Sequence, residues 1–467
     1  MDRLSFIKKV GIATTIGVIS PSLAFAKETL TKKDKKIIAT LPSLYADVIV
    51  VGAGPSGIPA AIAAAREGAK VILLEEDSLP GGAPVDMYVD MLCGGPRVGI
   101  FREMIQQLNR DFHPSGKPNP EFGEDAYKVP GQVFLPSSYA IVASDMMARE
   151  KNLTLMCGAH VSEVIMEVKG NRNIVKGVSI YRGLQKQHVI APVTIDATGT
   201  GLIGELAGAP VMYGKDGRSV FNESIGSEMP NDQVQQCTWQ FFSQALKPGA
   251  KLPWDKLKWK GMVEFDHGWV KGNPETLDRA TGLYLNWGGK FTCKDTRDPV
   301  ALAETQYEAL ESLSADFEAY QNAGFMVHLA PKLGVREVRR IKGEYVINTE
   351  DIIQGKYADD TIAHCHYGLD SWGESFKKDN IKAKPYGIPY RSLLPLNVEG
   401  LILAGKSISG SHIAASSYRV QSVVASIGQA AGTAAAMASI NKTSPRNIDV
   451  KKLIGKLDQA GLFINKK

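Results

Sequence analysis

The chain has 467 residues, of which 44% are hydrophobic and 22% are charged, and its formal net charge is +5. A chain of this length exceeds what one simple core organises, so we expect a two-domain or inserted-domain architecture. The positive charge is spread along the sequence without a basic block, which excludes the usual signature of a nucleic-acid partner.

The first 26 residues have the pattern of a cleavable signal peptide. Basic side chains near the start precede an apolar stretch over 10–19, and Ala24-Phe25-Ala26 supplies a small-x-small cleavage site. The apolar stretch is too short to span a bilayer, and Pro21 interrupts the chain directly after it. We therefore expect export to the periplasm or the medium, without a stable membrane span.

Two export routes are open to this segment. Arg3 to Lys8 resembles a twin-arginine signal in which leucine replaces the second arginine, so the ordinary secretory route is the alternative. Residues 27–45 are polar and lysine-rich, and we expect them to link the signal to the first strand.

The most informative segment begins with an apolar run over 48–51, which enters Gly52-x-Gly54-x-x-Gly57. In this strand-to-helix context the first glycine permits a tight turn, the second lets the backbone approach a pyrophosphate, and the third allows close helix–strand packing. A second apolar run ends in Glu75, placed to accept hydrogen bonds from a ribose. An acidic residue there argues against a 2′-phosphate and favours FAD or NAD over NADP.

The loop after the second apolar run holds two further candidates. Gly82 lies in a Pro-Gly-Gly-Ala segment whose amides are placed to reach the cofactor phosphates, and Cys93 is placed to approach a bound ring. The chain has five widely spaced cysteines: Cys93, Cys157, Cys237, Cys293 and Cys365. Without a CxxC pair, they indicate neither a zinc site nor a redox-active disulfide. We expect most of them to pack as small apolar groups, with one or two structural bridges as the alternative.

From Leu153 the pattern becomes that of β-strands. Short apolar or alternating runs separated by turn residues continue to Ile195, where the last strand enters Asp196-Ala197-Thr198-Gly199. An apolar strand that ends in Ala-Thr-Gly predicts a second close approach of backbone to a ligand, or else a plain turn.

Residues 211–385 are predicted to form an inserted substrate domain. Five of the six tryptophans fall between 239 and 287, among prolines, glycines and charges. These rings are expected either to line a sugar or ring pocket or, more often, to stabilise a small irregular core.

The chain then returns to the dinucleotide fold over 386–440, and 441–467 form a predicted C-terminal tail. A short apolar strand ends in Ala404-Gly405, and the next helix carries Gly428 among other small residues. Small residues on one helix face permit close approach to a sheet or a cofactor.

Together these segments resemble the FAD-dependent oxidoreductases of the glutathione-reductase-like Rossmann class, in which an opening fingerprint, a mid-chain Ala-Thr-Gly and a C-terminal Ala-Gly strand clamp one FAD. A narrower likeness, to the subfamily with the signature GVRExRRIxGxY, rests on Gly334 to Tyr345, Ile388 to Arg391, Ala404 to Ser409, and Gly428 to Ala435. The resemblance implies an α/β fold with a Rossmann-type FAD-binding domain in two parts, 46–210 and 386–440, and an inserted α+β substrate or cap domain.

The resemblance also implies which residues hold FAD. Gly52, Gly54 and Gly57 would hold the pyrophosphate, and Glu75 would hold the adenosine ribose. The Val161 backbone would contact the adenine, and Gly199 and Gly405 would lie against the cofactor. Amides near Gly428 would face the ring end. Arg419 would reach either a phosphate or a flavin carbonyl.

We expect hydride transfer from an alcohol carbon to flavin N5, while a base removes the hydroxyl proton. His412 is the favoured base because it follows the strand expected to pass the ring and because imidazole titrates near neutral pH, although a structural histidine is the alternative. The second choices are His364, His366 and Tyr390. Arg336 and Arg339 either anchor an anionic substrate or form structural ion pairs.

No second glycine fingerprint in strand-to-helix context is present, so a dedicated NAD(P)H domain is not evident. We expect a small-molecule substrate, with carbohydrates and polyols as the first class, and an acceptor such as a quinone, a small carrier or oxygen. The alternatives are a flavin-dependent reductase of an unsaturated acid, a flavin monooxygenase and a non-catalytic flavin-binding protein.

Overall fold

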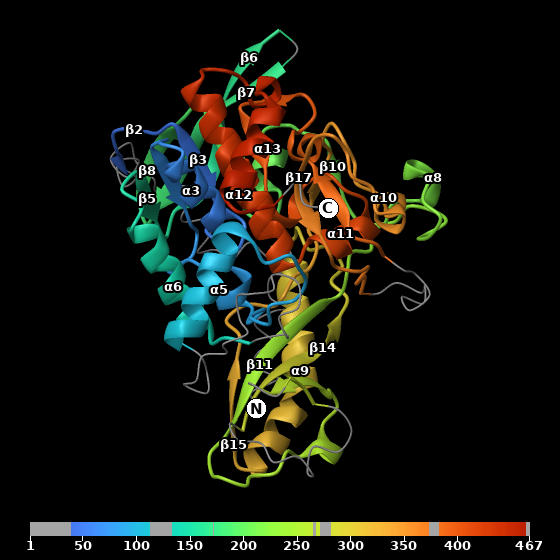
Figure 1. Cartoon of the computed structure of the whole chain (residues 1–467). Helices are drawn as coiled ribbons and strands as arrows, with labels where there is room; N and C mark the ends of the chain where they lie inside the picture. The colour runs from blue at the N-terminus through green and yellow to red at the C-terminus, as the bar shows by residue number, and fades with distance from the viewer. Residues whose placement is uncertain are drawn as a thin grey trace, which may run out of the picture.

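The computed structural model describes residues 39–112, 133–170, 172–264, 268–270, 282–372 and 383–463. The chain forms a larger body and a narrower one, and the narrower body contains β11 (Cys237–Ala245), β14 (Leu283–Phe291) and α9 (Pro299–Asn322) (Figure 1). The predicted signal peptide and most of the predicted linker lie outside the described residues. Two short strands at the end of that linker, β1 (Ala39–Thr40) and β2 (Leu44–Tyr45), already pair with the larger body.

A five-stranded parallel sheet organises the larger body. Its strands are, in spatial order, β20 (Leu401–Leu403), β9 (Val193–Asp196), β3 (Val48–Val51), β4 (Val71–Leu74) and β5 (Leu153–Met156). Three of them contain apolar residues alone, as expected of a parallel sheet covered on both faces. The register places Val51 opposite both Leu74 and Asp196, so the carboxyl ends of these strands meet at one edge.

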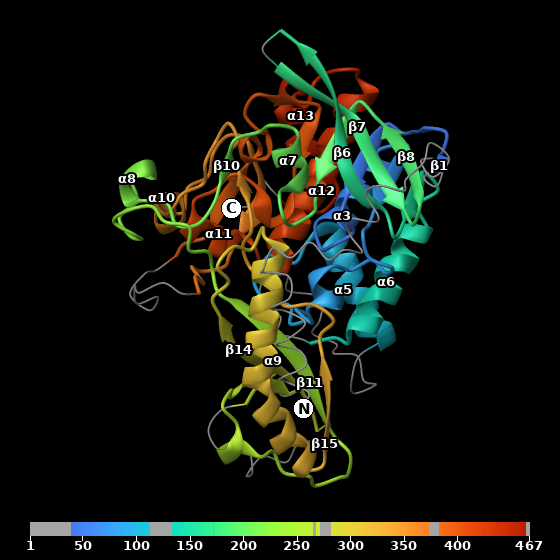
Figure 2. The ribbon, with the colours of Figure 1, turned by 180° about the vertical axis from the view of Figure 1, so that it is seen from behind.

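Different layers cover the two faces of this sheet. The helices α3 (Gly57–Arg66) and α12 (Gln421–Ile440) lie on one side in Figure 1, and the antiparallel strands behind them come to the front in Figure 2. Those strands are β6 (His160–Lys169), β7 (Arg172–Arg182) and β8 (Gln185–Ile190), with β19 (Val398–Glu399) added to β7. Further helices of this body include α4 (Ala83–Asp86), α5 (Gly99–Phe112), α6 (Pro136–Ala148), α7 (Leu202–Leu206), α10 (Thr349–Gln354), α11 (His412–Tyr418) and α13 (Val450–Gln459).

The helices α3 and α12 approach each other at backbone distance. A Cβ added at Gly428 would lie 2.0 Å from the Ser56 carbonyl oxygen, and one at Gly432 would lie 2.0 Å from the Ala60 carbonyl oxygen. Only glycine permits this crossing. Within the described residues α12 is the one helix with the length and hydropathy of a membrane span, and 89% of that window is buried inside the protein, as in a core helix.

The narrower body is a five-stranded antiparallel sheet with a core of its own. The strands run in the order β13 (Gly268–Trp269), β12 (Gly261–Glu264), β14, β11 and β15 (Phe325–Leu329), and α9 packs against β14 and β15. Trp239, Trp254 and Trp259 belong to this core, and Trp239 Nε1 donates to the Ala330 carbonyl at 2.8 Å. These three rings therefore stabilise the core, the second of the two interpretations above.

The boundaries of the two bodies differ from the predicted limits of the insert, 211–385. The second core draws its residues from 237–335, whereas Ile341, Ile347 and Ile362 belong to the core of the larger body. The β17 (Thr361–Cys365) and β18 (Tyr386–Pro389) pair crosses the expected boundary, and Leu453 of α13 is fully buried, so the predicted tail contributes to the core. The fold is nevertheless the expected α/β type.

Candidate functional site

The glycine fingerprint forms a tight turn between β3 and α3. Gly52 has φ +97°, and a Cβ there would lie 2.6 Å from the Ala197 carbonyl oxygen of the neighbouring strand. A Cβ at Gly57 would lie 1.7 Å from the Gly52 carbonyl oxygen, so the helix packs directly on the turn. Both residues therefore have the structural tasks that the sequence predicts.

Gly54 differs from its two neighbours because the space beside it is open. A Cβ at Gly54 would meet only the Gly82 Cα, at 3.8 Å, and Gly82 itself has φ +58°. The Ser56 hydroxyl, next to the start of α3, is buried and has no hydrogen-bond partner within the described residues. This open cradle and orphaned hydroxyl at a helix N-terminus fit a pyrophosphate.

Glu75 follows β4 at the same sheet edge. Its Oε2 accepts a hydrogen bond from the Ala53 amide at 2.6 Å, and its Oε1 accepts one from the Asp77 amide at 3.0 Å. Burial raises the pKa of this carboxyl, although the two amide hydrogen bonds oppose the shift. Glu75 thus stabilises the glycine-rich turn from the position expected for the ribose ligand.

The Ala-Thr-Gly segment and the Ala-Gly strand end beside this turn. The buried Asp196 carboxylate accepts from the Thr198 hydroxyl at 2.7 Å and from the Gly204 amide of α7 (Leu202–Leu206) at 3.0 Å, which fixes the turn before Gly199. A Cβ at Gly199 would lie 3.6 Å from Lys406 Cε, and one at Gly405 would lie 3.4 Å from Ser56 Cβ. Both glycines therefore border the cradle.

Val161 and Gly428, two residues expected at the cofactor, lie within packed secondary structure. Val161 is in β6, paired with Ile180, and packs partly buried against the core. Gly428 lies inside α12, where its lack of a side chain serves the crossing with α3, and the expectation that amides near it face the ring end stays a prediction.

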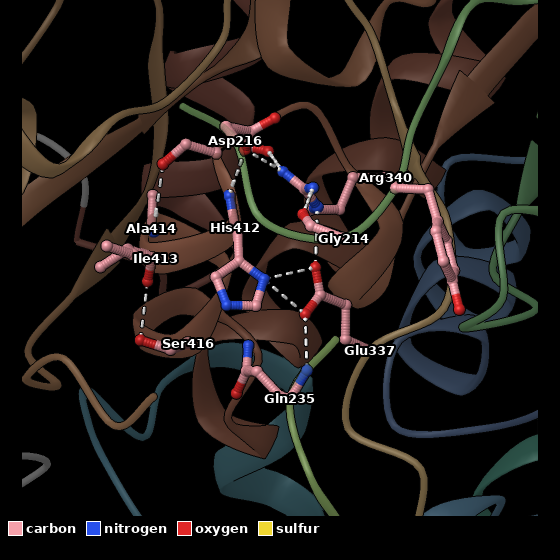
Figure 3. Close-up of polar contacts among 12 residues, drawn as sticks. Gly214, Asp216, Gln235, Glu337, Arg340, His412, Ile413, Ala414 and Ser416 are labelled. Carbon is pink, nitrogen blue, oxygen red and sulfur yellow. Dashed lines mark hydrogen bonds and ion pairs between the residues drawn. The ribbon is translucent and has the colours of Figure 1, made fainter. Parts of the chain in front are cut away.

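His412 begins α11 (His412–Tyr418) and is held in a buried polar network. Its backbone amide donates to Asp216 Oδ2 at 2.8 Å, and its Nδ1 lies 2.8 Å from Glu337 Oε2. The side chains of His412 and Glu337 are only 3% and 2% exposed. In Figure 3 the Glu337 carboxylate lies between the imidazole, the Arg340 guanidinium and the Gln235 backbone amide.

The charges of this network offset one another. Arg340 Nε lies 3.0 Å from Glu337 Oε1, and Arg340 NH1 lies 2.6 Å from Asp216 Oδ2. Burial alone raises the pKa of Glu337, but its interactions with His412 and Arg340 and the hydrogen bond from the Gln235 amide outweigh burial and hold that pKa below its ordinary value. An ionised Glu337 fixes the orientation of the imidazole, which is what a catalytic histidine requires.

The carboxamide of Gln235 is the unsatisfied part of this network. The Gln235 backbone amide donates to Glu337 Oε2 at 3.1 Å. Both side-chain polar atoms are buried without a hydrogen-bond partner in the described part of the chain. Buried amides are rarely left in this condition, so a ligand is the expected partner.

A second cluster, of cations, adjoins the network. Arg336 NH1 donates to the Gln236 carbonyl at 2.7 Å and to the Thr238 hydroxyl at 2.9 Å, and its guanidinium lies 3.8 Å above the Trp372 ring. Arg419 donates to the Asp370 carboxylate at 3.2 Å, and Lys406 Nζ donates to the Val335 carbonyl at 2.5 Å. We call Arg336, Lys406 and Arg419 the cationic cluster.

The cationic cluster is short of negative charge. Burial, reinforced by the charge of Arg419, lowers the pKa of Lys406 to about 8 and that of Arg336 to about 9. In the described residues Arg336 and Lys406 donate to neutral oxygens, and Arg419 pairs with one carboxylate, Asp370. Three cations around one carboxylate favour an anionic ligand.

Other predicted residues lie outside this centre. The buried Tyr390 hydroxyl donates to the Pro445 carbonyl at 2.9 Å and burial raises its pKa, which favours a structural role over the predicted catalytic one. Arg339 pairs with Glu205 at 2.5 Å and is structural. His364 lies in β17 with its Nδ1 3.3 Å from the Tyr357 hydroxyl.

The cysteines take no part in disulfide bonds: all five are free thiols. Cys93 lies beside the cationic cluster, where burial raises its pKa to about 11, so it is a neutral thiol rather than a nucleophile near neutral pH. Within the described ranges no group of His, Cys, Asp and Glu side chains could hold a metal ion.

The sequence does not reveal several members of the site. Glu337 and Lys406 lie inside the family motifs, but a charged run does not show which of its side chains points inward. Gln235, Asp370 and Trp372 carry no motif, and only the folded chain brings them together.

Comparison with known proteins places these features in a family. A family model described as "FAD dependent oxidoreductase" matches residues 47–457. Sarcosine oxidase subunit alpha of Rhizobium meliloti (strain 1021) is 56% identical over 39 residues, which cover 8% of this chain and 4% of that protein. The tRNA uridine 5-carboxymethylaminomethyl modification enzyme MnmG of Geobacillus kaustophilus (strain HTA426) is 30% identical over 233 residues, which cover 44% of this chain and 34% of that enzyme.

Solved structures with distant similarity include a geranylgeranyl bacteriochlorophyll reductase-like protein from Thermoplasma acidophilum and the myxobacterial chondrochloren halogenase CndH. The first has 14% identity and a TM-score of 0.39, covering 89% of this chain and 83% of its own. The second has 12% identity and a TM-score of 0.40, covering 89% and 79%. The chain spans 4% and 34% of the two curated relatives, so their activities are not transferred.

Proposed function

The chain belongs to the family of FAD-dependent oxidoreductases, and from this premise we propose that it dehydrogenates an alcohol carbon of a small substrate. FAD is its cofactor, held by the open cradle at Gly54, the start of α3 and the turns at Gly199 and Gly405. When bound, FAD supplies the acceptor for the hydride that leaves the alcohol carbon.

The observation that carries the proposal is the buried pair of His412 and Glu337. With Nδ1–H donating to the Glu337 carboxylate, the lone pair of the imidazole is on Nε2. His412 Nε2 then takes the hydroxyl proton while the carbinol hydrogen leaves with its electron pair, and the C–O single bond becomes a carbonyl. The substrate loses two electrons and two hydrogens: His412 holds one as a proton, and the other is the hydride for which FAD, when bound, would supply the acceptor.

An anaerobic bleaching screen tests this function. Purified holoprotein is mixed with alcohols, polyols and hydroxy acids without any reductant, and the flavin absorbance is followed. Dehydrogenation predicts loss of that absorbance with at least one substrate, and a His412→Ala variant that retains FAD is expected to lose this bleaching. Full turnover by His412→Ala would remove this residue from the mechanism.

The cationic cluster favours one second candidate, a reductase of an unsaturated acid. Arginines around a carboxylate and a nearby proton donor are what such a reaction needs, and Arg336, Arg419 and His412 supply those chemical types. Reoxidation of the pre-reduced enzyme by an unsaturated acid, with no bleaching of the oxidised enzyme by any alcohol, would select this function instead.

We also propose that the protein is exported, on the pattern of residues 1–26, and that it falls in the GVRExRRIxGxY subfamily, on Gly334 to Tyr345. N-terminal sequencing of the protein from fractionated cells tests the first point. A cytoplasmic protein that begins at Met1 would contradict it.

A further inference from the structure

The segment Gln235–Thr238 connects the two halves of the site. On one side the Gln235 amide donates to Glu337, the partner of His412. On the other side the Gln236 carbonyl accepts from Arg336, and the Gln236 amide donates to the Trp372 carbonyl at 3.1 Å. Neighbouring residues of one segment therefore contact both Glu337 and Arg336.

Arg336 is oriented for a planar anion. Its Nη1 donates to Gln236 and Thr238, and its Cζ lies 3.8 Å from the centroid of the Trp372 ring. Its Nε and its other terminal nitrogen make no hydrogen bond to any described residue. Two N–H groups on one edge of a guanidinium match the two oxygens of a carboxylate.

The Gln235 carboxamide supplies a hydrogen-bond donor and acceptor for an uncharged group of the ligand. Both groups are buried and have no partner among the described residues. A hydroxyl satisfies both, since it accepts from the amide N–H and donates to the amide oxygen. A ligand without such a group leaves a buried carboxamide unpaired, at a cost that discriminates strongly against it.

We propose that the substrate is a hydroxy acid, with its carboxylate on Arg336 and the cationic cluster and its hydroxyl at Gln235 and His412. This inference rests on the proposed dehydrogenation and adds the substrate class to it. The reaction converts the hydroxy acid to the keto acid, with the hydroxyl proton on His412 and a hydride that FAD, when bound, would accept. A neutral polyol leaves the cations uncompensated, and an acid without a hydroxyl leaves Gln235 unpaired.

The test compares gluconate with glucitol, which differ in having a carboxylate or a hydroxymethyl group at one end. Anaerobic bleaching and calorimetric binding to oxidised holoprotein are both measured. The inference predicts that gluconate, or another of a panel with lactate, tartrate and glucuronate, binds and bleaches the flavin, and that its neutral counterpart is at least about 10-fold less effective.

Arg336→Gln and Gln235→Met identify the residues responsible. The first is expected to weaken binding of the acid by about 10- to 100-fold and to change binding of the neutral alcohol far less, and the second to weaken binding of the acid less than its turnover. Arg297→Gln is the matched control, because Arg297 also lies 3.8 Å above an aromatic ring, Tyr213, but outside the cluster. FAD content and thermal unfolding confirm that each variant folds.

The outcomes separate the inference from the proposed function. If polyols bleach the flavin as well as the acids do and Arg336→Gln changes neither, the hydroxy-acid assignment is overturned while dehydrogenation stands. If no alcohol bleaches the flavin but the acids bind through Arg336, the dehydrogenation is overturned and anion recognition remains. If no acid binds at all, the inference is wrong.

Discussion

The Glu337→Gln substitution is the sharpest test of the buried network. It keeps the size of the side chain and one carbonyl oxygen but removes the negative charge that faces His412 Nδ1 at 2.8 Å and Arg340 Nε at 3.0 Å. Removal of one partner of a buried ion pair costs about 3–5 kcal/mol, because the other charge is left uncompensated. Arg340 retains Asp216 at 2.6 Å, so we expect the lower end, about 3 kcal/mol.

Thermal unfolding of the holoprotein measures this loss. At about 2 °C per kcal/mol for a large domain, Tm is expected to fall by about 6 °C. Glu205→Gln is the control, since Glu205 also pairs with an arginine, Arg339, but is 39% exposed, and such pairs contribute about 0–1 kcal/mol. Equal shifts in Tm for the two variants would refute the argument from burial.

The pH dependence of the stability tests the charge of Glu337 independently. The pKa of Glu337 is lower in the folded than in the unfolded protein, so its ionised form stabilises the fold above the ordinary pKa of 4.5, and this contribution is lost as the pH falls through the folded value. The difference in Tm between wild type and Glu337→Gln is therefore expected to narrow in acid below about pH 4.5. A difference that stays constant down to about pH 3 would show that the charge is not responsible.

Three further predictions concern the cofactor cradle, the helix crossing and the cationic cluster. Gly54→Ala is expected to fold normally but to bind FAD at least about tenfold more weakly, measured by titration of the apoprotein. An unchanged affinity would show that the pyrophosphate does not lie at Gly54. Gly428→Ala is expected to lower the free energy of unfolding by about 1–3 kcal/mol or more. Gly455→Ala in α13, where a Cβ would meet no atom within 4 Å, is expected to leave it unchanged or to raise it by about 0.5–1 kcal/mol. Similar Tm values for the two variants would contradict the close crossing of α3 and α12. Because Lys406 loses its charge as the pH rises through about 8, affinity for an anionic substrate is expected to fall there, and Lys406→Arg should move that fall to higher pH; a flat profile would exclude Lys406 from anion binding.

The parallel sheet and its glycine turn were predictable because each has a local cause. Apolar runs such as 48–51 require burial, and Gly52 and Gly57 occupy positions where a Cβ would meet backbone within 3 Å. Glu75, Gly199 and Gly405 follow the ends of parallel strands, so topology alone brings them to one edge.

The rest of the site depends on tertiary contacts that no local pattern encodes. Periodicity does not distinguish a glycine that faces a ligand from one that faces a helix, so the sequence did not reveal that Gly428 packs on α3. Tyr390 lies in a family motif, but its hydroxyl is directed to Pro445, 55 residues away in sequence. The direct partners of His412, Asp216 and Glu337, come from two separate segments, and Gln235, which donates to Glu337, comes from a third.

The most direct measurement of the central claim is rapid anaerobic mixing of the oxidised holoprotein with its best hydroxy acid, unlabelled and deuterated at the carbinol carbon. The account predicts bleaching of the flavin without added reductant, slower with the deuterated substrate, and loss of this phase in a His412→Ala variant that retains FAD. An enzyme whose flavin is never bleached by any alcohol, but is reoxidised by an unsaturated acid after chemical reduction, would contradict it.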